Sequence, residues 1–435
     1  MKNIKMTIIG AGSSYMPELL EGIINNKIFK VYEIALVDVE AGMQNATIIL
    51  ELTKRMLKKV NNDAKIYLTM DRREALQNAD FVVTQIRVGG LDARIRDEKI
   101  PLRYGLIGQE TTGAGGFGNA LRTVPVIVEI AREMEEICPS AYLINFANPS
   151  GIVTQAVHQY SNIKCVGLCN LPINIERELS EYFGRRPEEV YVKMAGLNHL
   201  SFVTDILIDG VSRFGELFDE GYFTKKLAHQ TIEVEGGAEL IHKIRLMPTS
   251  YLQYFWFEQQ KLEQIQKDII QGIGTRGEQV KEVEQELFEI YADKTVDEKP
   301  KLLEKRGGAL YSTAALNLIS ALLNPVPTVQ IVNTLNKGAI PNLPYDAVVE
   351  CNALISTNGV HAITTDSLPA SVEPLVSQIK QFEMYTCEAA MAGDRELAYL
   401  ALLNHPLVHG HHNAIRLVED IIEENKAFLP NFYNK

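Results

Sequence analysis

Residues Met6-Thr-Ile-Ile-Gly-Ala-Gly-Ser-Ser-Tyr15 join an apolar, partly β-branched run to a glycine turn, and a second apolar run, Ile34-Ala-Leu-Val-Asp38, ends in an acid. A strand that feeds such a turn lets the N–H groups at the start of the next helix approach a pyrophosphate, and the acid accepts the ribose hydroxyls. The pattern favours NAD over NADP, because the carboxylate would repel a 2′-phosphate. The predicted dinucleotide-binding residues are Gly10, Gly12, Ser13, Ser14 and Asp38.

Strand-like and helix-like segments alternate on either side of this unit. The apolar runs typical of strands are residues 5–9, 33–37, 65–68, 80–85, 141–145 and 165–168. Helical periodicity marks residues 17–26, 44–59 and 123–136. Such alternation implies right-handed crossovers and a doubly wound, mostly parallel sheet, whose ligands bind beyond the carboxyl ends of the strands.

The pattern changes after residue 196. Irregular polar segments follow, with a charged helix predicted over residues 278–291 and an Ala/Leu-rich helix over 311–323. We therefore expect an α/β protein with a Rossmann-like NAD-binding domain over residues 1–196. A second, mixed α+β domain is expected over residues 197–435.

Composition excludes several classes of protein. The chain has 435 residues and a net charge of −12, without the lysine-rich stripe that nucleic-acid binding needs. No apolar run approaches the roughly 18 residues of a membrane span, and the N-terminus lacks the features of an export signal. The five cysteines are scattered and odd in number, which predicts a reducing compartment rather than a disulfide framework. These observations favour a cytoplasmic protein without a membrane or nucleic-acid partner.

Polar residues interrupt the apolar pattern where strands should end. They occur in four segments, Gln85–Gly90, Asn145–Pro149, Gly167–Pro172 and Gly196–His199. Within them a thiol at Cys169 and an imidazole at His199 form a candidate pair of ligands for a borderline divalent metal such as Mn²⁺, Fe²⁺, Co²⁺ or Ni²⁺. The pair would leave positions for water and substrate oxygens. The alternative is a small core cysteine and a hydrogen-bonded core histidine.

Three further segments carry weaker signals. The glycine-rich run at residues 108–118 lacks the ending of a P-loop and is interpreted as a mobile cover over the cofactor or as an ordinary flexible loop. The histidines at 409, 411 and 412 favour a loop or helix entry over a metal site. An aromatic stripe at residues 248–256 is typical of a core face, although a tyrosine in it would act as a base if cations lowered its pKa.

Together these segments resemble glycoside hydrolase family 4, the NAD- and metal-dependent phosphoglycosidases, and most of all its 6-phospho-β-glucosidase branch. The resemblance covers nearly the whole chain. It is carried by Ile8-Ile-Gly-Ala-Gly-Ser-Ser, Ile86-Arg-Val-Gly-Gly-Leu-Asp-Ala-Arg94, Tyr104-Gly-Leu-Ile-Gly-Gln-Glu110-Thr-Thr-Gly, Cys169-Asn-Leu-Pro, Asn198-His199-Leu and Lys305-Arg-Gly-Gly308.

The resemblance implies a role for each matching residue. Cys169 and His199 become the ligands of a divalent metal, with Mn²⁺ expected, and Tyr251 becomes the catalytic base, with Tyr254 one helical turn away as the alternative. Substrate contacts are expected from Arg94, Asn148 and Arg276, with Arg87 as a further candidate, because a guanidinium fork suits phosphate oxygens.

Asn170 discriminates within the family. Members that act on α-glycosides typically carry Asp directly after the ligand cysteine, where it can protonate the leaving group. An amide cannot donate a proton in that way, so Asn170 favours the β-glycoside branch and leaves the leaving-group acid unidentified.

The reaction implied is hydrolysis of a 6-phospho-β-D-glucoside such as phosphorylated cellobiose. It proceeds by oxidation at C3, loss of the C2 proton, elimination at C1, addition of water and return of the hydride, unlike the two-carboxylate route of ordinary glycosidases. The resemblance also implies a homodimer or homotetramer.

Other functions remain open from the sequence. A 6-phospho-α-glucosidase or an α-galactosidase of the same family would use the same machinery. A 2-hydroxy-acid NAD-dependent dehydrogenase, or an NAD-binding sensor without catalysis, would share the nucleotide fold.

Overall fold

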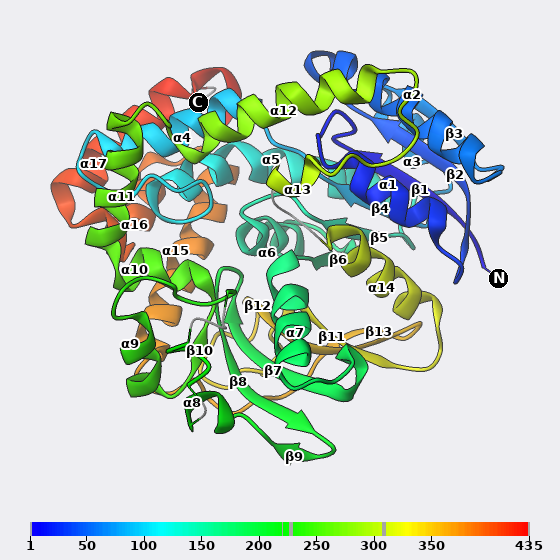
Figure 1. The fold of residues 1–435 in the computed structure, drawn as a ribbon. Helices are drawn as coiled ribbons and strands as arrows, with labels where there is room; N and C mark the ends of the chain where they lie inside the picture. The colour runs from blue at the N-terminus through cyan, green and yellow to red at the C-terminus, as the bar shows by residue number, and fades with distance from the viewer. Residues whose placement is uncertain (1, 220, 226–228, 307–309, 434–435) are drawn as a thin grey trace.

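The structure is a computed structural model that describes residues 2–219, 221–225, 229–306 and 310–433. In these residues thirteen strands form one mixed sheet, and eleven of them follow the order β10-β8-β7-β12-β11-β6-β5-β4-β1-β2-β3. One half of the sheet is parallel and the other antiparallel, and the two halves lie above and below each other in Figure 1.

The parallel half has the strand order 3-2-1-4-5-6 of a Rossmann fold. It consists of β1 (Asn3–Ile9), β2 (Lys30–Val37), β3 (Lys65–Thr69), β4 (Phe81–Thr84), β5 (Tyr142–Asn145) and β6 (Lys164–Gly167). These strands confirm the six predicted from apolar runs, with ends that differ by at most three residues.

Register brings the strand ends into one row. Val37, Ile9, Thr84, Asn145 and Gly167 lie side by side across the parallel half. The glycine turn, the acid after β2 and three of the four polar segments therefore leave the sheet at the same edge.

The antiparallel half joins through a single pairing, of Asn333 on β11 with Gly167 on β6. Its strands are β7 (Val190–Leu197), β8 (Leu200–Ile208), β9 (Val211–Ser212), β10 (Met247–Pro248), β11 (Thr328–Leu335), β12 (Val348–Ser356) and β13 (Gly359–Ala362). The tight connection between β7 and β8 consists of Asn198 and His199. The fourth polar segment, Gly196–His199, therefore belongs to this half of the sheet.

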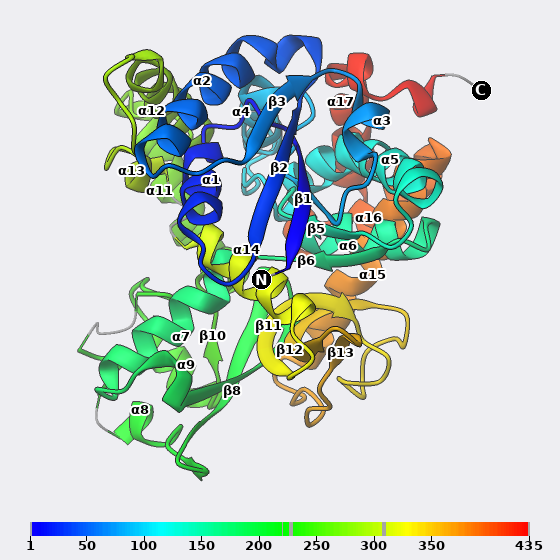
Figure 2. The same ribbon diagram turned by 90° about the vertical axis from the view of Figure 1, so that its right-hand side faces the viewer.

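Helices cover both faces of the parallel half (Figure 2). On one side lie α1 (Met16–Asn25), α2 (Met43–Lys59), α12 (Arg276–Ala292), α13 (Leu303–Arg306) and α14 (Tyr311–Leu323). On the other lie α3 (Arg72–Leu76), α5 (Gly113–Ile137), α6 (Ser150–Tyr160), α15 (Glu373–Ala392), α16 (Arg395–Leu403) and α17 (His411–Glu424).

The remaining helices border the strand ends or the antiparallel half. They are α4 (Gly90–Leu102), α7 (Asn170–Tyr182), α8 (Glu216–Asp219), α9 (Gly237–Ile244), α10 (Gln253–Trp256) and α11 (Glu258–Ile270). The helices predicted at 17–26, 44–59, 278–291 and 311–323 are confirmed as α1, α2, α12 and α14. No described helix is long and apolar enough to cross a membrane.

Strand alternation divides the core into two clusters. Ile34 and Leu36 of β2 belong to one cluster, and Ala35 and Val37 belong to the other. Successive side chains of a strand point to opposite faces, so each face of the sheet has its own apolar layer. The predicted division into residues 1–196 and 197–435 stays a prediction, because the sheet is continuous and α12 and α14 pack on the first part.

The two interpretations of residues 108–118, a mobile cover and an ordinary flexible loop, are both wrong for residues 113–118. Residues 113–118 are buried and form the first turns of α5. The glycines permit close packing instead: a Cβ on Gly115 would lie 2.2 Å from the carbonyl oxygen of Gln109, and one on Gly116 would lie 2.4 Å from the carbonyl carbon of Thr111. The run therefore fixes the segment before α5.

A fully buried ion pair holds α4 against α5. Both terminal nitrogens of Arg122 donate to the carboxylate of Asp97, at 2.8 and 2.6 Å, and Nη1 also donates to Asn425. The side chains are 0 and 1% exposed. Arg122 Nε donates to the carbonyl of Val88, directly after Arg87.

Replacement of Arg122 by Met is therefore expected to lower the free energy of unfolding by about 3–5 kcal/mol, since it leaves a buried carboxylate unpaired. Urea unfolding followed by circular dichroism measures the loss. The matched control is Arg177→Met, which breaks the exposed Arg177–Glu181 pair and should cost about 0.5 kcal/mol or less. Equal losses in the two variants would contradict the assignment.

Candidate active site

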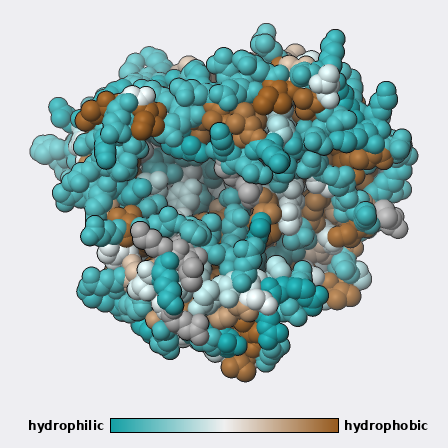
Figure 3. Space-filling model, viewed as in Figure 1, coloured by the Kyte–Doolittle hydropathy of each residue, from teal (hydrophilic) through white to brown (hydrophobic). Residues whose placement is uncertain are grey.

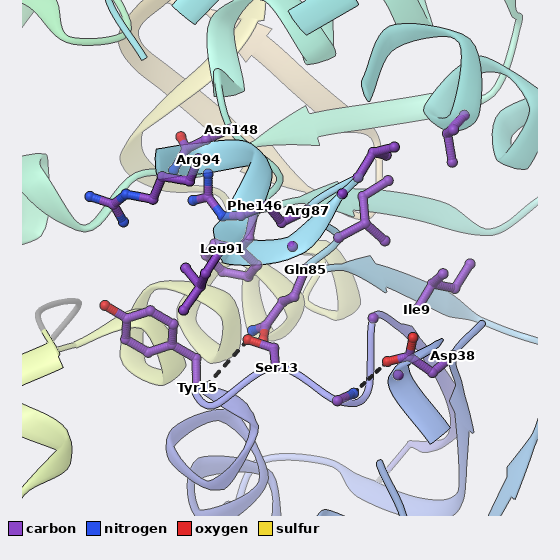
Figure 4. Close-up of a pocket in the computed structure, with 18 of the residues that line it drawn as sticks. Ile9, Ser13, Tyr15, Asp38, Gln85, Arg87, Leu91, Arg94, Phe146 and Asn148 are labelled. Atoms are coloured by element: carbon purple, nitrogen blue, oxygen red, sulfur yellow. Dashed lines mark hydrogen bonds between the residues drawn. The ribbon is translucent and has the colours of Figure 1, made fainter. Parts of the chain in front are cut away.

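The glycine turn after β1 is built to approach a ligand closely. Gly10 has φ +94°, and a Cβ there would lie 2.8 Å from the backbone of Gln85. The Gly12 N–H donates to Asp38 Oδ2 at 2.5 Å, and the Val39 N–H donates to Oδ1 (Figure 4). The turn and the acid therefore form one cradle, which fits a dinucleotide pyrophosphate and ribose.

Cys169 caps the N-terminus of α7. Its Sγ accepts the Leu171 N–H at 3.4 Å, and the first turn of a helix favours a thiolate. Burial raises the pKa of the thiol to about 12, the buried Glu350 carboxylate adds to the rise, and the hydrogen bonds from Leu171 and Asn198 oppose it. A bound cation would favour the thiolate by supplying the missing positive charge.

His199 faces this sulfur from the β7–β8 connection, where it has φ +63°. Its Nε2 lies 3.6 Å from Cys169 Sγ. Metal bonds of about 2.3 Å to sulfur and about 2.0 Å to nitrogen, at an angle of about 110°, place such donors about 3.5 Å apart. The pair therefore fits a divalent metal.

The remaining ligands of such a metal would come from outside the pair. Within the described ranges no three His, Cys, Asp or Glu side chains are grouped to hold a metal. The histidines at 409, 411 and 412 lie at the entry to α17, as predicted. Two protein ligands leave coordination positions open to substrate oxygens and water.

Tyr251 lies against the metal-ligand pair. Its ring stacks on that of His199 with centroids 3.7 Å apart and planes 6° apart. Burial raises the pKa of Tyr251 well above its ordinary value, and the neighbouring Cys169 adds to the rise, whereas Arg94 opposes it. Tyr254 lines the same cleft with its ring 6.1 Å from that of Tyr251.

Arg87, Arg94 and Arg306 lie close enough to Glu110 to affect its charge. Arg87 and Arg94 both contact Glu110, at 2.6 and 3.1 Å, and Figure 4 shows Arg87, Arg94 and Asn148 close together. Burial alone would raise the pKa of Glu110, but the arginines outweigh it and hold that pKa at about 2. Glu110 is therefore a permanent anion that orders the guanidinium groups.

Glu98 links this group to α12. One carboxylate oxygen accepts Arg94 Nε at 2.9 Å, and the other accepts the Gly277 N–H at 2.6 Å. Arg276, the residue before Gly277, is exposed and donates to the Lys305 carbonyl and the Gln279 side chain. In the described part of the chain Arg276 forms no ion pair, so its charge is uncompensated.

All but one of the predicted site residues line a single cleft of about 1450 Å³. They are Gly10, Gly12, Ser13, Asp38, Arg87, Arg94, Asn148, Cys169, Asn170, His199, Tyr251 and Arg276. The exception is Ser14, which is fully buried and donates to Glu284. Figure 3 shows the hollow between the two halves of the molecule. Its volume exceeds the roughly 300–1,000 Å³ of a small-ligand site and gives room for a dinucleotide and a sugar together.

Several cleft residues were missed from the sequence. Glu110 lies in a motif of the family resemblance without a predicted role, although a charged residue between Gly108 and Gly113 is a signal that points to it. Arg306, in the Lys305-Arg-Gly-Gly308 motif, lies over the Tyr15 ring at 4.6 Å and donates to Ser14 Oγ. Gly307 and Gly308 of that motif lie outside the described residues.

The fold and this cleft define a dinucleotide-binding enzyme with a thiol–imidazole pair, the candidate metal ligands, beside its cofactor cradle. The family model described as Family 4 glycosyl hydrolase matches residues 5–184, and that of its C-terminal domain matches residues 194–408. The chain belongs to family 4 of the glycosyl hydrolases.

Relatives extend over the full chain. A probable 6-phospho-beta-glucosidase of Bacillus subtilis is 46% identical, with 100% of this chain and 99% of that protein covered. The 6-phospho-beta-glucosidase of Escherichia coli is 40% identical, with 99% and 97% covered. The crystal structure of the Thermotoga maritima 6-phospho-beta-glucosidase with manganese, NAD+ and glucose-6-phosphate has a TM-score of 0.89 and 34% identity, with 98% of this chain and 99% of that chain covered.

The proteins that represent the alternatives are more distant. A phospho-alpha-glucosidase of Clostridium acetobutylicum is 27% identical over 98% of this chain and 99% of that protein. Malate dehydrogenase of Cryptosporidium parvum has 17% identity and a TM-score of 0.54, with 90% of this chain and 99% of that chain covered. This last likeness shows a shared fold alone. The dehydrogenase and α-glucosidase readings are therefore less supported than the β-glucosidase reading.

Proposed function

We propose that this chain hydrolyses 6-phospho-β-D-glucosides, such as phosphorylated cellobiose, with NAD and a divalent metal, most of all Mn²⁺. One observation carries the proposal: the dinucleotide cradle, the Cys169–His199 pair and the arginine group line the same cleft. When bound, NAD would accept and return a hydride at C3 of the sugar, and the metal would polarise the C2 and C3 oxygens.

The residues of the chain have distinct tasks in this proposal. Cys169 and His199 hold the metal, and Arg94, Asn148 and Arg276, with Arg87, bind the substrate. Tyr251 removes the C2 proton, because its ring contacts His199 beside the metal position. Burial raises the pKa of Tyr251, and Arg94 together with a bound metal cation would oppose that rise. Asn170 lines the cleft directly after Cys169, where an amide orients the substrate by hydrogen bonds without donating a proton to the leaving group.

The dinucleotide contacts follow from the cradle. Gly10, Gly12 and Ser13 approach the pyrophosphate through their backbone, and Asp38 accepts the ribose hydroxyls of NAD. Ser14 supports the turn through its side chain. Its hydroxyl donates a hydrogen bond to Glu284 and accepts one from Arg306 Nε.

The test is hydrolysis of a chromogenic 6-phospho-β-glucoside with NAD⁺ and Mn²⁺ omitted in turn. Turnover should require both, and NADH should not accumulate because the hydride returns to the sugar. Stoichiometric NADH would indicate a dehydrogenase instead. Faster turnover of the α-anomer or of the galactoside would favour the corresponding alternative within the family.

Replacement of Tyr251 by Phe is expected to lower kcat by about 10²–10⁴-fold, as for loss of a general base. Exchange of solvent deuterium into C2 of the sugar should fall with it, whereas hydride transfer between C3 and NAD should persist. Tyr254→Phe is the matched variant and should have the smaller effect on C2 exchange. The reverse order of effects would assign the base to Tyr254.

We also propose that the chain forms a homodimer or homotetramer. No residue of α11 is buried. Ile269 and Ile270 at its C-terminal end are 39 and 85% exposed, and Ile273, just beyond the helix, is 49% exposed. Apolar surface of this kind is covered in an assembly. A monomer mass in light scattering after size-exclusion chromatography would contradict the proposal.

The cytoplasm is the proposed compartment. All five cysteines, Cys138, Cys165, Cys169, Cys351 and Cys387, are unpaired and buried. Free thiols in these numbers fit a reducing environment, and a metal-binding thiolate at Cys169 depends on one.

A further inference from the structure

We propose that Thr111 and Gln109 are positioning residues that fix the tautomer of His199, so that its bare Nε2 faces the metal position. The inference rests on the proposed function only in that Cys169 and His199 hold the metal. Thr111 does not line the cleft, whereas Gln109 does. They act through the imidazole that Thr111 contacts.

The backbone of Thr111 fixes the orientation of the Gln109 amide. The Thr111 N–H donates to the side chain of Gln109 at 2.6 Å. A backbone N–H is only a donor, so the atom that receives it is the amide oxygen, Oε1. The orientation of the Gln109 amide is thereby fixed without reference to His199.

The same oxygen lies 2.9 Å from Thr111 Oγ1. Two oxygens at this distance need a proton between them, and the Thr111 hydroxyl is the group that has one. The hydroxyl therefore donates to Gln109 and can only accept from its other neighbour, His199 Nδ1, at 2.9 Å. In neutral His199 the proton is on Nδ1, and Nε2 carries the free lone pair.

The stack with Tyr251 cannot make this choice. It confines the plane of the His199 ring but does not distinguish its two nitrogens. Nε2 is the atom 3.6 Å from Cys169 Sγ, so a proton there would block the metal. The hydroxyl of Thr111 therefore selects the tautomer that binds metal.

The segment that carries Thr111 is held firmly enough for this role. Gly115 and Gly116 let α5 pack directly on the backbone of Gln109 and Thr111, and Asn119 Nδ2 donates to the Glu110 carbonyl at 3.3 Å. Thr111 itself is 9% exposed. The glycine-rich run thus connects the start of α5 to the metal position.

The first test measures binding of Mn²⁺ alone to the full-length protein, by the electron paramagnetic resonance signal of free Mn²⁺. Thr111→Val should weaken binding about 10–100-fold, as for loss of the partner that orients a ligand histidine. Thr111→Ser, which keeps the hydroxyl, should bind as the wild type does. Gln109→Leu should also weaken binding, because it frees the Thr111 hydroxyl to donate to Nδ1.

The matched control is Thr112→Val, the same change one residue along on a buried threonine whose side chain makes no cap hydrogen bond. It should retain wild-type Mn²⁺ binding. Circular dichroism and thermal unfolding show whether each variant folds. A folded Thr111→Val protein with wild-type Mn²⁺ affinity would overturn the inference.

A second measurement needs no variant that could misfold. Two-bond ¹H–¹⁵N correlation spectra of the metal-free protein, labelled with ¹⁵N-histidine, report the tautomer of each ring, and His199 is assigned by its absence from the His199→Gln spectrum. We expect Nδ1 protonated and Nε2 bare, and the opposite pattern overturns the inference. Failure of wild-type protein to bind Mn²⁺ would instead contradict the proposed function.

Discussion

Replacement of Cys169 by Ser is expected to lower kcat/KM for a 6-phospho-β-glucoside by at least about 10³-fold, because the metal supplies the main electrostatic stabilisation of the reaction. A Cys169 thiolate would give the metal a negatively charged ligand, whereas a serine hydroxyl remains protonated in its place. With only His199 left in the pair, the metal should be lost during dialysis. The measurements are turnover and bound Mn²⁺ in the same preparation.

The fold of this variant should persist, since the side chain lies at a cleft wall rather than in the centre of the core. Cys138→Ala is the matched control, because it removes a buried thiol at the end of α5, a helix whose other end approaches the site. It should retain activity and metal. Near-normal turnover by Cys169→Ser in metal-free buffer would contradict the metal-ligand assignment.

The parallel half was predictable because its signals are local. Apolar runs mark β1 to β6, and the positive φ of Gly10 and the acid after β2 follow from residues close in sequence. The row of strand ends from Val37 to Gly167 then follows from topology, since parallel strands must end at one edge.

The meeting of Cys169 and His199 was not derivable from spacing. It depends on β11 pairing with β6 and on β12 pairing with β7, contacts between segments more than a hundred residues apart, and on β11 pairing with β12. From spacing alone, a core cysteine and a core histidine are the favoured interpretation. The antiparallel half is what brings the β7–β8 connection over the end of β6.

The glycine-rich run shows a different limit. Composition favours a flexible loop at residues 108–118, but glycine also permits backbone to pack on backbone. The second effect applies where a neighbouring chain is present, as Gln109 and Thr111 are beside Gly115 and Gly116. Which of the two effects applies depends on the tertiary structure. The roles of Glu110 and Thr111, which lie in this run, could therefore not be predicted from the sequence.

The second large effect is expected at Arg276. Arg87 and Arg94 are paired with Glu110, and Arg94 also with Glu98, so their charges are largely compensated before substrate binds. Arg276 is exposed at the start of α12. There the N–H groups of Gly277 and Glu278 are already taken by Glu98 and Thr275, so the helix end itself has little left to offer a phosphate.

Arg276→Met is therefore expected to lower kcat/KM for a 6-phospho-β-glucoside by about 10²–10³-fold, the effect of losing two charge-assisted hydrogen bonds to phosphate. Hydrolysis of the unphosphorylated glucoside should be weak in both proteins and unchanged by the substitution. Most of the loss should be in KM, because the phosphate is remote from C1 to C3 and binds equally before and during the reaction.

Lys281→Met is the matched control for this change. It removes a positive charge from the same helix, where Lys281 pairs with Asp92 and both side chains are more than half exposed. The Lys281→Met protein should prefer the phosphorylated substrate as strongly as the wild type does, because an exposed ion pair contributes little to the stability of the helix. Arg276→Lys separates charge from geometry: an ammonium keeps the attraction but cannot form the paired contact, so it should recover part of the KM. An unchanged ratio of phosphorylated to plain glucoside hydrolysis in Arg276→Met would place phosphate recognition on Arg87 and Arg94 instead.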